Sequence, residues 1–125
     1  MVGFYNTMNP KVRKAIEEFA ERIKIEVGKE IELMLVYGSA LTDRYREGMS
    51  DIDVLIVSPK RESYDKILDI QTDVGARYGV AFSVLFESPS EVKEVIKARS
   101  PFMKEVMKTG EVLYGNRRGR IEVGA

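Results

Sequence analysis

Residues 50–57 read Ser-Asp-Ile-Asp-Val-Leu-Ile-Val, a buried strand that begins with two acids. Strands disfavour aspartate, so Asp51 and Asp53 need a reason of their own. Because strand side chains alternate between faces, both carboxylates are predicted to point the same way, roughly 6–7 Å apart. Such a pair is costly on a partly buried sheet unless hydrogen bonds or a cation stabilise it, and its oxygens suit Mg²⁺ or Mn²⁺. The alternative is a strand entry at which one aspartate caps a turn and the other is exposed.

The preceding apolar run, Ile31–Tyr37, predicts another buried strand, which ends at Gly38-Ser39. Glycine lets the backbone approach a ligand, and a serine at such a turn can donate to a phosphate oxygen. Eleven residues separate Ser39 from Asp51, enough for a short helix and a turn within 40–50 that bring the aspartates back beside the bend. The sequence therefore predicts that a phosphate-binding turn and a carboxylate pair converge. An ordinary strand-to-helix turn with a serine cap is the alternative.

The remaining elements alternate between helix and strand. Cap signals and apolar spacing predict helices over 10–27, through 67–78, from 89 to about 99 and from 101 to 109, and strands over 80–86 and 112–114. The helix ending at Tyr78 is long enough for a right-handed crossover, which makes strands 51–57 and 80–86 parallel neighbours. We expect an α+β (α/β two-layer) domain over 1–115, with a small mixed sheet of three to four strands and helices packed against it. Residues 116–125 are expected to form a basic, flexible tail.

Composition limits the chemistry. The chain has neither cysteine nor histidine, which excludes disulfides, thiolate zinc sites and imidazole bases. Its 20 Lys and Arg balance 20 Asp and Glu, so no general attraction to nucleic acid or an anionic membrane is expected. Without a long apolar run or a signal-peptide pattern the protein is expected to be cytoplasmic. The 32 % of charged residues is a balance found in thermophile proteins.

Residues 37–39, the eleven-residue gap and residues 51–54 together resemble the signature of the DNA polymerase β nucleotidyltransferase superfamily, in particular its minimal single-domain nucleotidyltransferases. The stretch from Ser100-Pro101-Phe102 to 110–114 is similar to the usual end of such domains. The match is fairly specific, because it requires four features together: the glycine-serine pair, the length of the gap, the aspartate pair and the apolar strand that follows.

The resemblance implies roles for the matching residues. Asp51 and Asp53 would hold Mg²⁺ or Mn²⁺, while Gly38 and Ser39 would contact the triphosphate of ATP or another nucleoside triphosphate. The implied reaction is in-line attack of an acceptor hydroxyl on the α-phosphorus, with pyrophosphate leaving. The implied partner is a helical HEPN-type protein of a toxin–antitoxin pair, which can itself be the acceptor. Oligomeric state is left open, and a homo-oligomer is compatible with the sequence.

Two positions depart from the family pattern. Family members commonly carry a third carboxylate on the next strand of the site, where this chain has Ser83, and Glu87 lies roughly 13 Å further along. The family's basic residue two positions after the serine is replaced by Leu41, so Arg44 or Arg46 would contact phosphate or remain solvated. The alternative function is therefore a catalytically weak or inactive nucleotide-binding or interaction module. A nucleic-acid-modifying enzyme is disfavoured by the neutral charge.

Spacings typical of core positions are found for three methionines, Met34, Met103 and Met107, and for four of the aromatic residues. This prediction includes Phe102, together with Phe19, Phe82 and Phe86. Tyr37 is the aromatic residue that could face the site instead.

Overall fold

The computed structural model describes residues 8–115 and contains one four-stranded sheet in the order β3-β2-β1-β4. Its strands are β1 (Leu33–Tyr37), β2 (Ile52–Val57), β3 (Phe82–Glu87) and β4 (Glu111–Gly115). β1 runs antiparallel to β2 and β4, while β2 and β3 are parallel. The predicted α+β class with a small mixed sheet is confirmed, as is the parallel pairing that follows from a helical crossover.

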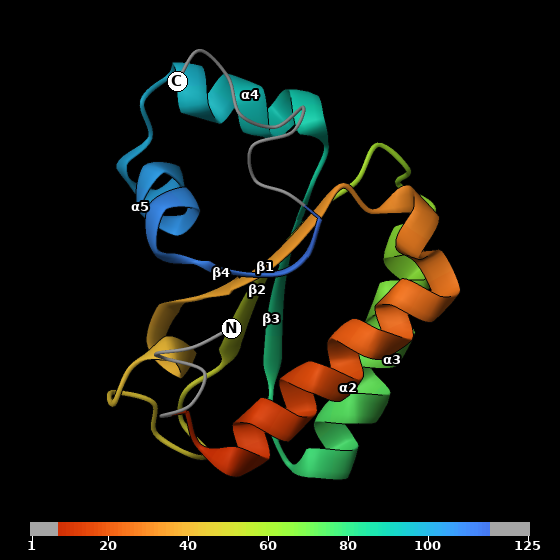
Figure 1. Ribbon diagram of the computed structural model, residues 1–125, viewed down its shortest axis with the longest axis vertical. Coiled ribbons are helices and arrows are strands. Elements are labelled where there is room, and N and C mark those ends of the chain that lie inside the picture. Colours follow the sequence, from red (N-terminus) through yellow and green to blue (C-terminus); the bar gives the residue numbers. More distant parts are fainter. Residues whose placement is uncertain (1–7, 116–125) are drawn as a thin grey trace.

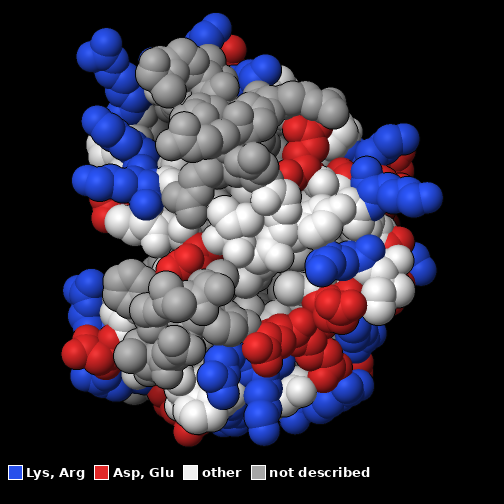
Figure 2. All heavy atoms as spheres, in the orientation of Figure 1, with Lys and Arg blue, Asp and Glu red and all other residues white. Residues whose placement is uncertain are grey.

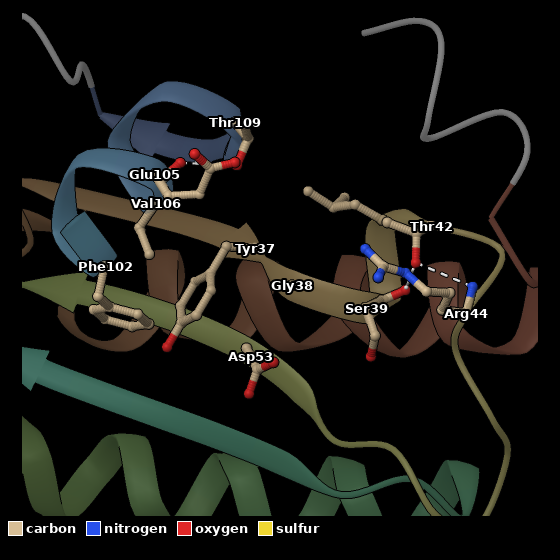
Figure 3. A pocket seen from close by; sticks show the side chains of 11 residues that line it. Tyr37, Gly38, Ser39, Thr42, Arg44, Asp53, Phe102, Glu105, Val106 and Thr109 are labelled. Atoms are coloured by element: carbon tan, nitrogen blue, oxygen red, sulfur yellow. Dashed lines mark hydrogen bonds between the residues drawn. The ribbon is translucent and has the colours of Figure 1, made fainter.

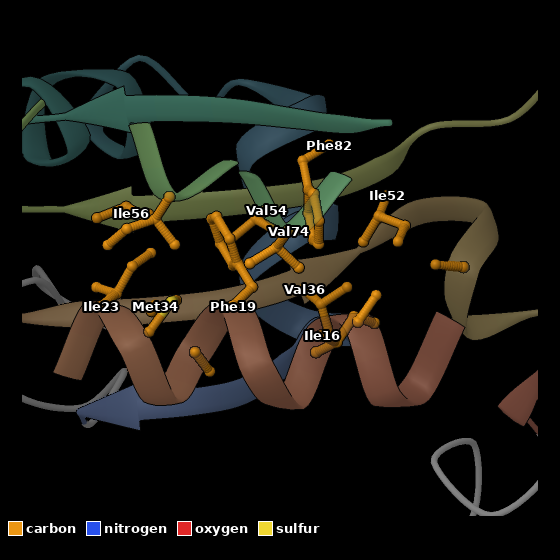
Figure 4. Close-up of a cluster of buried hydrophobic side chains, with 14 of the residues drawn as sticks. Ile16, Phe19, Ile23, Met34, Val36, Ile52, Val54, Ile56, Val74 and Phe82 are labelled. Atoms are coloured by element: carbon orange, nitrogen blue, oxygen red, sulfur yellow. The ribbon is translucent and has the colours of Figure 1, made fainter. Parts of the chain in front are cut away.

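Helices cover both faces of this sheet (Figure 1). On one face lie α2 (Pro10–Val27) and α3 (Ser63–Tyr78), and on the other α4 (Pro89–Lys97) and α5 (Pro101–Thr109). Strand alternation divides the side chains of β2 between two apolar clusters. The larger cluster, against α2 and α3, contains Phe19 stacked on Phe82 at 4.4 Å between ring centroids (Figure 4). The smaller cluster, under α4 and α5, contains Leu55 and Val57.

Local signals set the helix ends much as predicted. The Asn9 side chain accepts hydrogen bonds from the backbone N–H groups of Lys11 and Val12. Ser88 and Glu91 form a capping box at the start of α4. Gly79 ends α3 in the left-handed conformation, with φ +66°. Within residues 8–115, no helix combines the length and apolar character needed to cross a membrane.

Several boundaries differ from the sequence prediction. β1 and β3 each begin two residues later than expected, and α4 ends at Lys97 rather than Arg99. The helix expected within 40–50 is replaced by η2 (Gly38–Leu41), a short 3₁₀ helix, followed by turns. Thr42 Oγ1 donates to the Ser39 carbonyl and accepts from the Arg44 N–H, so side-chain bonds compete with helix formation here. The basic tail predicted over 116–125 lies outside the described residues.

Candidate functional site

The bend at the end of β1 lies directly against Asp53. Tyr37, the last residue of β1, is the register partner of Asp53 on β2. The next residue, Gly38, has φ +81°, and a Cβ placed on it would lie 2.5 Å from Asp53 Oδ2. This position therefore needs glycine twice over, for its backbone conformation and for the space that the Asp53 carboxylate occupies. The sequence predicts that both aspartates converge with the bend, and the structure shows this for Asp53, whereas Asp51 is exposed.

A cavity of about 530 Å³ opens at this bend, between η2 and α5. Figure 2 shows a notch in the left-hand outline of the molecule, on the side where Figure 1 places α5 and the segment that follows β1. The walls of the cavity come from the end of β1, from η2 and the turn after it, from β2 and from α5. The lining residues are Tyr37, Gly38, Ser39, Leu41, Thr42, Arg44, Asp53, Phe102, Glu105, Val106 and Thr109. Figure 3 shows the rings of Phe102 and Tyr37 on one side of Asp53, with Ser39 and Arg44 on the other.

The electrostatics of the cavity favour a cation. Burial raises the pKa of the Asp53 carboxyl, and the nearby negative charge of Asp51 raises it further. Burial also raises the pKa of the Tyr37 hydroxyl, with Asp53 adding to the effect. Asp51 is exposed and does not line the cavity, although its charge acts on Asp53. A positive charge beside the two carboxylates would relieve this repulsion.

The position of a third carboxylate is occupied by serine. Ser83 is the register partner of Asp53 on β3, while Glu87 pairs with Val57 at the other end of both strands. Within residues 8–115, no cluster of three or more acidic, histidine or cysteine side chains could hold a metal ion. Mg²⁺ at nucleotide sites is commonly held by one or two carboxylates together with substrate phosphates. The oxygens of Asp51 and Asp53 fit that arrangement, and do not fit a metal site built from protein ligands alone.

Ser39 and Arg44 supply groups that suit an anion. Ser39 is half-buried in the cavity wall. Its carbonyl accepts hydrogen bonds from the backbone N–H and the hydroxyl of Thr42, while its own hydroxyl has no hydrogen-bond partner within residues 8–115. Of the two arginines considered from the sequence, Arg44 lines the cavity. The Arg46 guanidinium instead donates to the backbone carbonyls of Asp43 and Tyr45.

Helix α5 contributes a wall that the sequence prediction missed. Phe102, Glu105, Val106 and Thr109 follow the spacing i, i+3, i+4, i+7 and form one face of the helix along the cavity. The prediction that Phe102 is a core residue is wrong, because its side chain is 52 % exposed. Met103 and Val106 provide the buried contacts of α5 instead. Helical spacing alone could have identified this face, but not that the face borders the Gly38 bend.

Comparison with known proteins gives a family match over most of the chain. Residues 14–119 match the family model described as "Polymerase beta, Nucleotidyltransferase". The CCA-adding enzyme of Methanopyrus kandleri is 36 % identical over 78 residues, which span 55 % of this chain and 16 % of that enzyme.

Two solved structures match this chain to different degrees. One is a mutant of the toxin–antitoxin pair MntA–HpeT, with TM-score 0.50 and 13 % identity over 83 % of this chain and 76 % of that one. Another is a tri-AMPylated HEPN toxin of Shewanella oneidensis in complex with an MNT antitoxin, with TM-score 0.40, 12 % identity and coverage of 79 % and 75 %. The first of these supports the same overall fold.

Proposed function

The chain belongs to the polymerase β nucleotidyltransferase family, and from this premise we propose that it transfers a nucleoside monophosphate from ATP or another nucleoside triphosphate to a hydroxyl, releasing pyrophosphate. The observation that carries the proposal is the contact of the Asp53 carboxylate with the Gly38 bend, inside a cavity of about 530 Å³. A site for an in-line phosphoryl transfer needs a carboxylate and a phosphate-binding turn within reach of the same phosphorus.

Each residue has a distinct task in this proposal. Gly38 leaves the backbone open to the triphosphate, the Ser39 hydroxyl donates to a phosphate oxygen, and the Arg44 guanidinium offsets phosphate charge. Asp51 and Asp53 would hold Mg²⁺ or Mn²⁺ jointly with the phosphates. When bound, the ion stabilises negative charge on the attacking and leaving oxygens. The new bond joins the acceptor oxygen to the α-phosphorus, and the bond from that phosphorus to the pyrophosphate oxygen breaks.

The proton of the acceptor hydroxyl has no protein base assigned to it. Ser83 lies where a third carboxylate would be expected to accept it. We therefore assign that proton to water and expect slow turnover, since a positioned base contributes typically 10²–10⁴-fold.

We propose a HEPN-type partner protein as the acceptor. The sequence resemblance to minimal nucleotidyltransferases motivates this partner. The toxin–antitoxin pair MntA–HpeT, which is similar in fold, supports an assembly of this kind.

The direct test is transfer of label from [α-³²P]ATP in the presence of Mg²⁺ and a HEPN-type protein from the same genome. We expect label on the partner, and none when EDTA is added or when the label is at the γ-phosphate. Binding of the partner without incorporation of label would contradict transfer.

The serine opposite Asp53, Ser83, also favours a second candidate function: a module that binds nucleotide or a partner protein without turnover. This candidate predicts that the double variant Asp51→Asn, Asp53→Asn binds the partner as tightly as the wild type, by calorimetry. Retained binding with no transfer by the wild type would favour the module. A thermal shift on adding ATP and Mg²⁺ without product would identify its nucleotide-binding form.

Arg44→Gln is expected to raise the KM or Kd for ATP by about 10-fold, since a hydrogen bond to a charged group contributes about 1.5–3 kcal/mol. The matched control is Arg46→Gln, because the Arg46 guanidinium is occupied by backbone carbonyls. Titration of both variants with ATP and Mg²⁺ checks this. Equal weakening by the two substitutions would show that Arg44 has no special contact with phosphate.

A further inference from the structure

Phe102 is unusual among the apolar side chains of α5. It is the second residue of that helix and is 52 % exposed, whereas Met103 and Val106 are buried. Its ring meets the Tyr37 ring edge to face, with centroids 5.7 Å apart and an interplanar angle of 81°. Both rings line the cavity. An exposed phenylalanine held against a second ring in a cavity wall offers an aromatic surface to a ligand.

The two rings line the same cavity as the proposed phosphate site. Tyr37 precedes Gly38 directly and is the register partner of Asp53. The cavity therefore has an aromatic end, formed by Phe102 and Tyr37, and a polar end, formed by Ser39 and Arg44, with Asp53 between them (Figure 3). A nucleoside triphosphate has the same division, with an aromatic base at one end and an anionic tail at the other.

Resting on the proposed function, we propose that Phe102, supported by Tyr37, stacks against the base of the bound nucleotide, with a preference for purines. A purine presents two fused rings to the aromatic wall, and stacking of a base on an aromatic side chain contributes about 1–3 kcal/mol. This contact acts on the base alone and does not depend on the triphosphate.

The test compares Mg²⁺-ATP with Mg²⁺-tripolyphosphate, which has the anionic tail but no base. In Phe102→Ala we expect the Kd for ATP to rise by about 10-fold, while the Kd for tripolyphosphate stays unchanged. Phe102→Trp is expected to keep ATP affinity, and the wild type is expected to bind ATP more tightly than CTP. Calorimetry measures each of these dissociation constants. Met49→Ala is the matched control, because Met49 is 86 % exposed and does not line the cavity.

The outcomes separate the two proposals. If the wild type binds tripolyphosphate and Phe102→Ala leaves ATP affinity unchanged, the base contact is overturned while the phosphate site stands. Equal weakening of ATP and tripolyphosphate in Phe102→Ala also overturns it, because the effect then lies in the phosphate site or the fold. Failure of the wild type to bind tripolyphosphate and ATP alike counts against the proposed function itself. Since Phe102 is exposed, its replacement is expected to leave the melting temperature within a few degrees of the wild type.

Discussion

Asp53→Asn is expected to reduce nucleotidyl transfer by at least about 100-fold, the effect typical of losing one preorganised electrostatic group at a reacting centre. The amide has nearly the same shape as the carboxylate, so the contact with Gly38 is kept while the negative charge is lost. The measurement is transfer from labelled ATP at saturating Mg²⁺. Asp69→Asn is the matched control, because Asp69 is exposed on α3, on the opposite face of the sheet. It should leave transfer unchanged.

The same substitution is expected to stabilise the fold slightly. Burial and the charge of Asp51 raise the pKa of Asp53 above its ordinary value of 3.8. An acid whose pKa is higher in the folded state loses folding stability as pH rises through that raised pKa, because the unfolded chain ionises more easily. The wild type therefore carries this cost in full at neutral pH, and Asn does not. The gain in melting temperature should be present at neutral pH and shrink as pH falls toward 3.8.

Lost transfer together with a retained or raised melting temperature is what distinguishes a functional charge from a structural one. A variant that loses both activity and stability would instead indicate that Asp53 maintains the fold. Wild-type transfer by Asp53→Asn would rule out the proposed role of this carboxylate altogether.

Much of the site could be predicted because its features are local in the sequence. The aspartates at the head of an apolar strand contradict strand propensity, and such a conflict marks a position where function overrides local preference. Gly38 and Ser39 come immediately after the last residue of the preceding strand. The helix over 63–78 forces a parallel crossover, and that pairing correctly placed Ser83 opposite Asp53.

The wall formed by α5 could not be predicted in the same way. Phe102 has the spacing of a core residue, and only the packing of α5 over the end of β1 leaves its ring exposed in a cavity. The choice between Arg44 and Arg46 was equally non-local. It depends on the Thr42 side-chain bonds that replace the expected helix with turns. Contacts that depend on tertiary packing leave little periodic signal in the sequence.

Gly38→Ala is expected to reduce transfer by about 100-fold, as misplacing a reacting group by 1 Å can do. At φ +81° any side chain is strained, which costs about 1–2 kcal/mol of stability. The added methyl would also lie 2.5 Å from Asp53 Oδ2, so the carboxylate must move away from the bend. Both effects come from one carbon atom, and the second acts directly on the proposed site.

Gly48→Ala separates these two effects. Gly48 has φ +79°, nearly the value of Gly38, and a Cβ placed on it would meet nothing within 4 Å. Its replacement should therefore cost a similar 1–2 kcal/mol of stability by chemical denaturation, with transfer within about two-fold of the wild type. If the two variants lose equal stability and only Gly38→Ala loses transfer, the position of the Asp53 carboxylate against the bend is what catalysis requires. Equal loss of transfer in both would trace the defect to backbone strain, and the bend would then have no specific part in binding the nucleotide.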